Sequence, residues 1–160
     1  MGNYLFSTSL EWLHLMATVA WIGGMFTNFI IYLPVIGKSL DPPTIGKLMG
    51  GVMKRFRVMV YSSIGIFVLT GLIRAISFGR LEGLFQFQER WAIIFVLKQV
   101  VFVAMVILAI YAFEFLAPKV ARMAASGPSP ELGRIQKFQM SMAKTGLILG
   151  ITLLALTAAL

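Results

Sequence analysis

Four long apolar runs constrain this chain more than any other feature of its sequence. They cover about residues 10–34, 58–76, 91–117 and 140–160. A membrane-spanning helix needs about 20 apolar residues, and only helices and closed barrels satisfy their backbone hydrogen bonds inside lipid. Because the alternating pattern of barrel strands is missing, we expect an all-α integral membrane four-helix bundle in which residues 1–160 form a single transmembrane domain.

The composition supports a membrane protein. Hydrophobic residues make up 59% of the chain and charged residues only 12%, whereas about 25% of residues are charged in a typical soluble domain. The formal net charge of +8 does not indicate a nucleic-acid partner, because the basic residues lie at the ends of the apolar runs, where they meet lipid headgroups. We therefore expect the lipid bilayer as the partner and no nucleic acid.

The basic residues also predict the orientation in the membrane. The connection between the second and third runs, with the adjoining helix end, holds three of them, Arg74, Arg80 and Arg90. The connections after the first and third runs, with the adjoining helix ends, hold ten: Lys38, Lys47, Lys54, Arg55, Arg57, Lys119, Arg122, Arg134, Lys137 and Lys144. Cytoplasmic loops carry an excess of Lys and Arg. We therefore expect a multi-pass protein of a cell (inner or plasma) membrane, with both termini extracytoplasmic.

Depth in the bilayer follows from this orientation. His14, the only histidine, lies near the outer end of the first run, and Trp21 follows two helical turns later. Arg74 lies near the outer end of the second run, and Lys98 lies about two turns into the third, roughly 11 Å along the helix. We expect these four side chains to share the outer half of the membrane.

His14 is the strongest candidate for a functional residue. An imidazole is costly to bury in a membrane helix without a partner. A neutral imidazole binds haem iron, zinc or copper through one nitrogen while the other donates a hydrogen bond, and Glu11 on the same face is a candidate acceptor. The alternative is a histidine that only hydrogen-bonds a backbone carbonyl.

The ligand inventory narrows the choice of metal. Zinc prefers three or four N, S or O ligands, which one His and no Cys do not supply. Copper(I) accepts thioethers, but the 10 methionines are scattered along the chain. Haem needs a single protein ligand. The expected haem b pocket consists of the iron ligand His14, the lining residues Trp21, Gly23, Gly24 and Met25, and the propionate partners Arg74 and Lys98.

Lys98 has a second candidate role. A lysine inside a membrane helix costs roughly 2.5–3.5 kcal/mol near mid-bilayer. Its ammonium group either extends toward the membrane surface, or binds an anionic group or transfers protons. The second alternative makes Lys98 the candidate catalytic residue.

Two local patterns concern the helices themselves. Asp41 precedes two prolines and Thr44, a pattern typical of a helix N-terminus. We expect a short amphipathic helix from here to Arg57, separate from the second spanning helix. In the fourth run, Gly146 and Gly150 form a small-xxx-small pair that favours close helix packing.

The order of several motifs resembles the CopD-like (copper-resistance protein D) superfamily of four-helix membrane proteins, which includes the HemJ-type protoporphyrinogen oxidases. The matching features are His14 followed by W-I-G-G at 21–24, L-T-G at 69–71 followed by Arg74, an apolar run up to Lys98, and Arg134 and Lys137 before the fourth run. The resemblance implies a haem-associated membrane bundle, with His14 as the matching haem ligand and Lys98 as the matching buried lysine.

The function predicted from these observations is that of a haem-dependent oxidoreductase with a reactive iron near the outer face. Its substrate would be a gas such as oxygen or nitric oxide, or a porphyrinogen. Copper or small-ion transport or resistance is one alternative. A homo-oligomer that shares one haem between two copies of His14, as an electron-transfer b-type cytochrome, is another, and a purely structural membrane subunit is a third.

Overall fold

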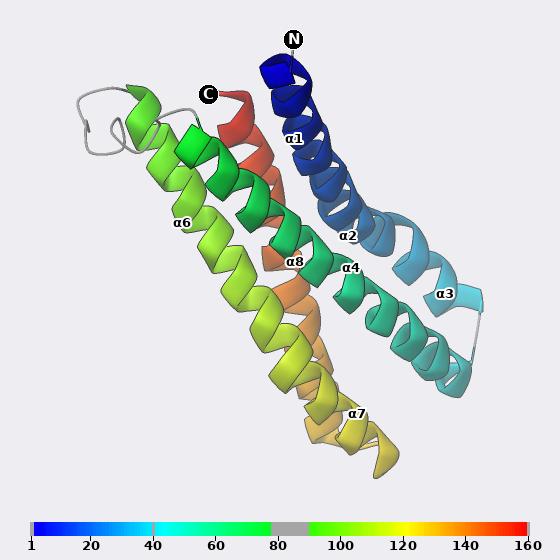
Figure 1. Cartoon of the computed structure of the whole chain (residues 1–160). Helices are drawn as coiled ribbons and strands as arrows, with labels where there is room; N and C mark the ends of the chain where they lie inside the picture. The colour runs from blue at the N-terminus through cyan, green and yellow to red at the C-terminus, as the bar shows by residue number, and fades with distance from the viewer. Residues whose placement is uncertain (1, 40, 78–89, 160) are drawn as a thin grey trace. The chain divides into compact units, whose positions relative to one another are not determined.

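The computed structural model describes residues 2–39, 41–77 and 90–159, and these are helical apart from short connections (Figure 1). Four helical segments are long and apolar enough to cross a membrane: Tyr4–Ile36, Thr44–Ser77, Arg90–Ala125 and Pro130–Ala158. No strand occurs in the described ranges. The prediction of an all-α protein with four spanning helices is therefore confirmed. Arg80 and Leu160 lie outside the described residues.

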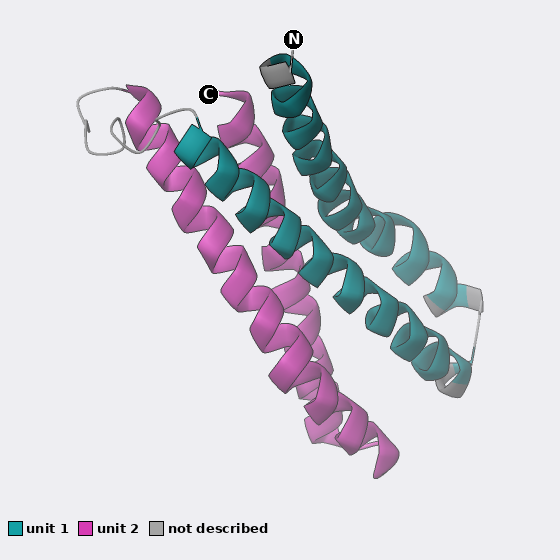
Figure 2. Ribbon diagram, in the orientation of Figure 1, with its two compact units in different colours: residues 1–81 teal, residues 82–160 magenta. Residues whose placement is uncertain are grey.

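The chain divides into two compact units, Met1–Leu81 and Glu82–Leu160 (Figure 2). Each unit consists of two long antiparallel helical rods joined by a short connection. In unit 1 the connection lies next to Asp41, and in unit 2 it covers residues 126–129. Within each unit, one rod packs along the other.

The first rod of unit 1 is one continuous helix with two π-helical segments. It consists of α1 (Gly2–Thr18), η1 (Val19–Gly23), α2 (Gly24–Thr27), η2 (Asn28–Tyr32) and α3 (Leu33–Ser39). The junction residues keep right-handed helical dihedral angles, so the helix extends well beyond the predicted run of 10–34. Thr18 and Thr27 donate to the carbonyls of His14 and Gly23, both at 2.9 Å, which satisfies their hydroxyl groups inside lipid.

The second rod of unit 1 is a single helix, α4 (Pro42–Ser77), of 36 residues. The predicted break near Arg57, between an amphipathic helix and a spanning helix, is therefore wrong. No proline follows Pro43 in this segment. A glycine costs only about 1 kcal/mol relative to alanine in a helix, so the glycines at 46, 50 and 51 do not end it.

Unit 2 has the same hairpin plan. Its first rod consists of α6 (Arg90–Ile110), η3 (Tyr111–Leu116) and α7 (Ala117–Ala125), and its second rod is α8 (Pro130–Ala158). The chain reverses at Gly127, whose φ of 101° lies in the left-handed region that favours glycine. Ser129 then caps α8 by accepting from the N–H of Leu132 at 3.1 Å. Gly146 and Gly150 are buried, as expected for packing glycines.

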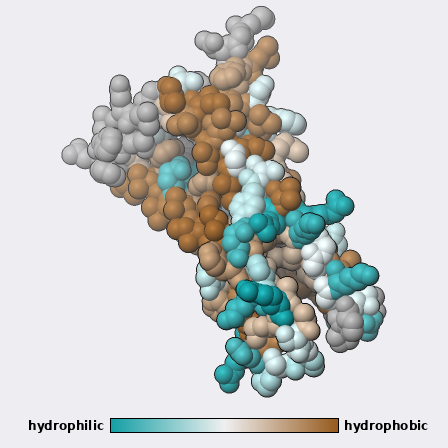
Figure 3. Space-filling view, turned by 60° about the horizontal axis from the view of Figure 1, so that its bottom comes forward, coloured by the Kyte–Doolittle hydropathy of each residue, from teal (hydrophilic) through white to brown (hydrophobic). Residues whose placement is uncertain are grey.

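The spanning segments are longer than the hydrocarbon core of a bilayer. Thr44–Ser77 has 34 residues and Arg90–Ala125 has 36, which correspond to about 51 and 54 Å of helix, whereas the hydrocarbon core is roughly 30 Å thick. The parts of α4, α7 and α8 next to the short connections carry most of the basic residues. In Figure 3 much of the surface is hydrophobic, and hydrophilic side chains gather toward the lower end of the view. These features fit a multi-pass membrane protein.

Asp41 caps α4, as its sequence pattern predicts. The hydroxyl and the backbone N–H of Thr44 both bond its carboxylate and lower the pKa of Asp41 below the ordinary value of 3.8; the N–H lies 3.2 Å from Oδ2. Because the pKa is lowered, the capping stabilisation is complete above the ordinary value and is lost as the pH falls through the lowered one.

We predict that Thr44→Val raises the pKa of Asp41 toward its ordinary value of 3.8, as measured by carboxyl carbon NMR. An unchanged titration would contradict this role.

Candidate functional site

His14 is hydrogen-bonded across the interface between α1 and α4. Its Nδ1 lies 2.8 Å from Oγ1 of Thr70, a residue with 1% of its surface exposed. The Thr70 hydroxyl donates to the carbonyl oxygen of Ile66 in its own helix, at 2.7 Å. Because a hydroxyl has one proton, Thr70 accepts from the Nδ1–H of His14. In the neutral ring, Nε2 is then the nitrogen that carries the lone pair.

One aromatic ring packs against this imidazole, and a second packs against the first. Phe67, on α4, meets the His14 ring edge to face, with 4.7 Å between ring centroids and an angle of 63° between planes. Trp21 packs against Phe67 from the first rod, at 6.1 Å between centroids. Phe67 and Trp21 are both buried. The imidazole therefore combines a polar contact to Thr70 with an apolar aromatic wall.

A π-helical segment begins five residues after His14. It is η1, Val19–Gly23, and it carries the buried Trp21. A π turn adds a residue to a helical turn, and such turns often occur at functional sites. No proline or cap pattern marks the segment in the sequence, so the sequence does not predict it.

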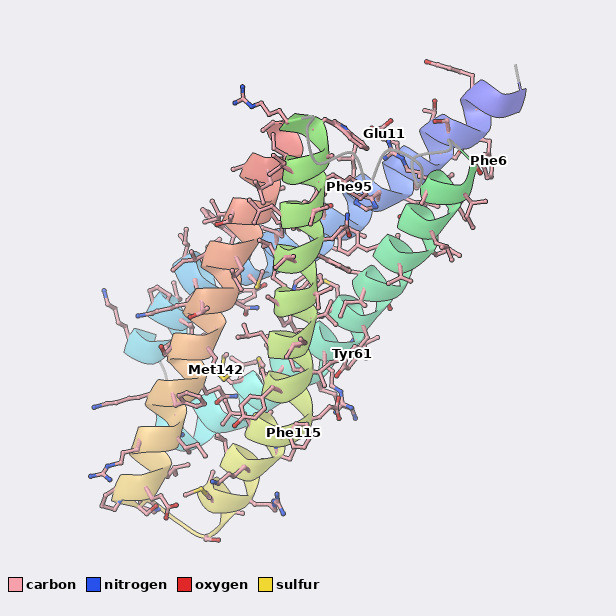
Figure 4. All side chains as sticks on the ribbon, turned by 90° about the vertical axis from the view of Figure 1, so that its left-hand side faces the viewer. Phe6, Glu11, Tyr61, Phe95, Phe115 and Met142 are labelled. Carbon is pink, nitrogen blue, oxygen red and sulfur yellow. The ribbon has the colours of Figure 1, made fainter. Side chains whose placement is uncertain are left out.

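The acceptor for His14 was also not predicted from the sequence. Glu11, the expected acceptor, is exposed on α1 (Figure 4). The Nδ1 of His14 instead bonds Thr70, 56 positions along the chain. Only the pairing of α1 with α4 brings these two residues together, and no local signal in the sequence reveals it.

Gly24 and Met25 lie on the same rod as His14 but further along it. A Cβ atom at Gly24 would lie 2.6 Å from Cε of Met59 and 2.8 Å from Cε2 of Phe56, so Gly24 permits close packing against α4. Gly23 faces open space, and Met25 is buried. At 1.5 Å per residue, these three residues are about 14–16 Å from His14 along the helix. The structure does not bring them together with the imidazole.

The two expected propionate partners lie in different units. Arg74 is half-buried on α4, one helical turn beyond Thr70. Lys98 is half-buried on α6, in unit 2. Within the described part of the chain, no group of three or more His, Cys, Asp or Glu residues is arranged to hold a metal ion.

Asn28, in η2, is a further polar residue that the sequence pattern does not single out. Its Oδ1 is buried and has no hydrogen-bond partner among the described residues. Buried carbonyl oxygens normally accept a hydrogen bond. Asn28 lies fourteen residues after His14, about 21 Å along the helix, so it is separate from the imidazole site.

Comparison with known proteins identifies the family. A family model described as a domain of unknown function, DUF4149, matches residues 16–129, which is well over half of the chain. The chain belongs to the DUF4149 family. The matched segment contains Trp21, Phe67, Thr70 and Arg74, and it starts two residues after His14. No curated protein and no solved structure matches this DUF4149 chain.

The packing of Gly24 gives a prediction with a neighbouring control. Gly24→Ala places a methyl group against Phe56 and Met59, and overpacking typically costs about 1–3 kcal/mol. Gly23→Ala places the same group in open space and gains helix propensity. Thermal unfolding in detergent is expected to show a lower midpoint for Gly24→Ala than for Gly23→Ala. Equal midpoints would contradict the close contact.

The bond between His14 and Thr70 gives a second prediction. Thr70→Val keeps the shape but removes the acceptor, and an unsatisfied buried polar group costs about 1–3 kcal/mol. Thr152→Val is the control, because its exposed hydroxyl donates only locally, to the carbonyl of Ile148 at 3.0 Å. Denaturant unfolding should show a clear loss of stability for Thr70→Val and little change for Thr152→Val. The same loss in both variants would argue against the interhelical bond.

Proposed function

We propose that this DUF4149 protein is a haem b-binding integral membrane protein in which Nε2 of His14 binds the iron. The observation that carries the proposal is the hydrogen bond from Nδ1–H of His14 to Thr70. A histidine that ligates a metal almost always donates its other N–H to a fixed acceptor, which sets the tautomer and the ring orientation. The arrangement of His14 and Thr70 has this form.

The donor set favours haem over other metal groups. The sequence has one histidine and no cysteine, and haem iron needs only one protein ligand. The ring of Phe67 provides apolar contact beside the imidazole, and Trp21 packs against Phe67. Arg74, one turn beyond Thr70, is a cation for a propionate. Lys98 belongs to unit 2, so its roles as a second cation and as a proton-transfer group stay predictions from the sequence.

The proposed activity is that of an oxidoreductase. A haem held by one protein ligand would react with a small substrate, such as oxygen or nitric oxide, or with a porphyrinogen. The bound haem would supply the one-electron and oxygen chemistry. The chain itself would hold the iron through His14, keep the ring tautomer fixed through Thr70, and exclude water with Phe67 and Trp21. This activity agrees with the resemblance to the CopD-like superfamily.

In the proposed orientation, both termini lie on the extracytoplasmic side of the membrane. The basic residues near the connections of α3 to α4 and of α7 to α8 support it, because cytoplasmic segments are rich in Lys and Arg. His14 and Arg74 then lie toward the extracytoplasmic side.

Copper transport is a weaker fit to the same residues. His14 and Met25 are the candidate copper ligands on the first rod, but they are about 16 Å apart along one helix. They therefore do not bind the same ion within one chain.

The proposal predicts a haem b spectrum for the purified protein. Expressed with a haem supply, the wild-type protein should give a pyridine haemochrome spectrum, and His14→Ala should lose it. Thr70→Val should weaken haem binding by about 10–100-fold, as is typical for the partner of a metal-ligating histidine, whereas Thr70→Ser should retain it. Thr152→Val is the control for a lost hydroxyl.

Two outcomes would overturn this proposal. Wild-type protein without haem would exclude haem binding, and unchanged haem in His14→Ala would exclude His14 as the ligand. A low-spin spectrum of two histidine ligands would instead support a dimer that shares haem between two copies of His14 for electron transfer.

A further inference from the structure

A cavity opens at the connection end of unit 2. Its volume is about 470 Å³, and it is lined by Tyr111, Phe115, Leu116, Lys119, Arg122, Ile135 and Phe138. Pockets of about 300–1,000 Å³ are typical of small-molecule sites. All lining residues belong to η3, α7 and α8, so unit 2 forms the cavity by itself.

The lining combines aromatic rings with two cations. Tyr111 and Phe115 stack with 5.9 Å between centroids and 23° between planes, and Phe115 lies on the lower part of the first rod of unit 2 in Figure 4. Lys119 and Arg122 follow on α7 and are both exposed. An amphiphile with an apolar chain and a negatively charged head matches this combination.

The length of α6 supports a position of the cavity at a membrane interface. Tyr111 lies twenty residues after Trp91, which is near the start of α6. This distance is about 30 Å of helix, which equals the thickness of the hydrocarbon core. With Trp91 at one interface, Tyr111 reaches the other, where aromatic side chains are enriched.

The cations then lie at the level of the lipid headgroups. Lys119 is eight residues beyond Tyr111, about 12 Å further along the helix, and lines the same cavity. Lys and Arg side chains bury their stems in apolar surroundings and keep their charged ends among polar groups. Basic pockets between membrane helices at this level suit anionic lipid headgroups.

We propose that this cavity is a binding site for an anionic phospholipid. The headgroup phosphate binds Lys119 and Arg122, and an acyl chain packs against Phe115, Phe138 and the neighbouring apolar side chains. The site is independent of haem binding, because no residue is shared with the His14 site.

The test is native mass spectrometry of the full-length protein in detergent, titrated with phosphatidylglycerol or phosphatidylcholine. Wild-type protein should bind phosphatidylglycerol about tenfold or more tightly than phosphatidylcholine. Lys119→Gln/Arg122→Gln should remove this preference. The matched control is Arg134→Gln/Lys137→Gln, which removes two charges near the same end of unit 2 from residues that do not line the cavity; it should retain the preference.

Two further measurements distinguish a lipid-binding site from a diffuse basic surface and from a binding site for a free anion. Phe115→Ala should weaken phosphatidylglycerol binding, and excess inorganic phosphate should not displace the lipid. An equal loss in both charge variants would show a diffuse basic surface and overturn the proposal. Displacement by inorganic phosphate would show a site for a free anion and overturn it as well. Helical circular dichroism confirms that each variant is folded before titration.

Discussion

The hydrogen bond between His14 and Thr70 is the constraint on which unit 1 depends. Lipid provides no water to pair with an imidazole, so the ring needs a protein partner inside the membrane. The partner is a buried threonine whose own proton is already donated within α4. This arrangement joins two residues that are 56 positions apart in sequence and fixes the tautomer of the ring. Phe67 packs against the imidazole and Trp21 packs against Phe67. Further along the first rod, Gly24 in α2 allows a close approach to α4.

The membrane explains which parts of the fold were predictable. Each apolar run has to be a helix, because lipid leaves the backbone no other partner; the positions of the four spanning helices therefore followed from hydropathy. The cap at Asp41 was predictable because its chemistry is local, between residues 41 and 44. The continuation of α4 through residues 42–57 was not predictable from the sequence. A polar stretch with glycines carries no hydropathy signal, and its glycines disfavour a helix only weakly.

The candidate site was predictable only in part. His14 stood out as the single histidine in an apolar helix, and Trp21 as a ring on the same face. Thr70 and Phe67 were not predicted as its partners, because their contact with His14 depends on how α1 pairs with α4. Glycines at 23 and 24 were grouped with His14 by sequence proximity. The structure separates them from it, because residues nine and ten positions along a helix lie about 14–15 Å away.

The tautomer of His14 tests the role of the His14–Thr70 bond most directly. Because the sequence has one histidine, nitrogen-15 labelling of histidine gives the ring signals of His14 alone in the purified protein. The bond predicts a proton on Nδ1, with Nε2 unprotonated in the neutral ring, and loss of this fixed tautomer in Thr70→Val. A proton on Nε2 in the haem-free wild-type protein, or ring signals unaffected by Thr70→Val, would contradict it.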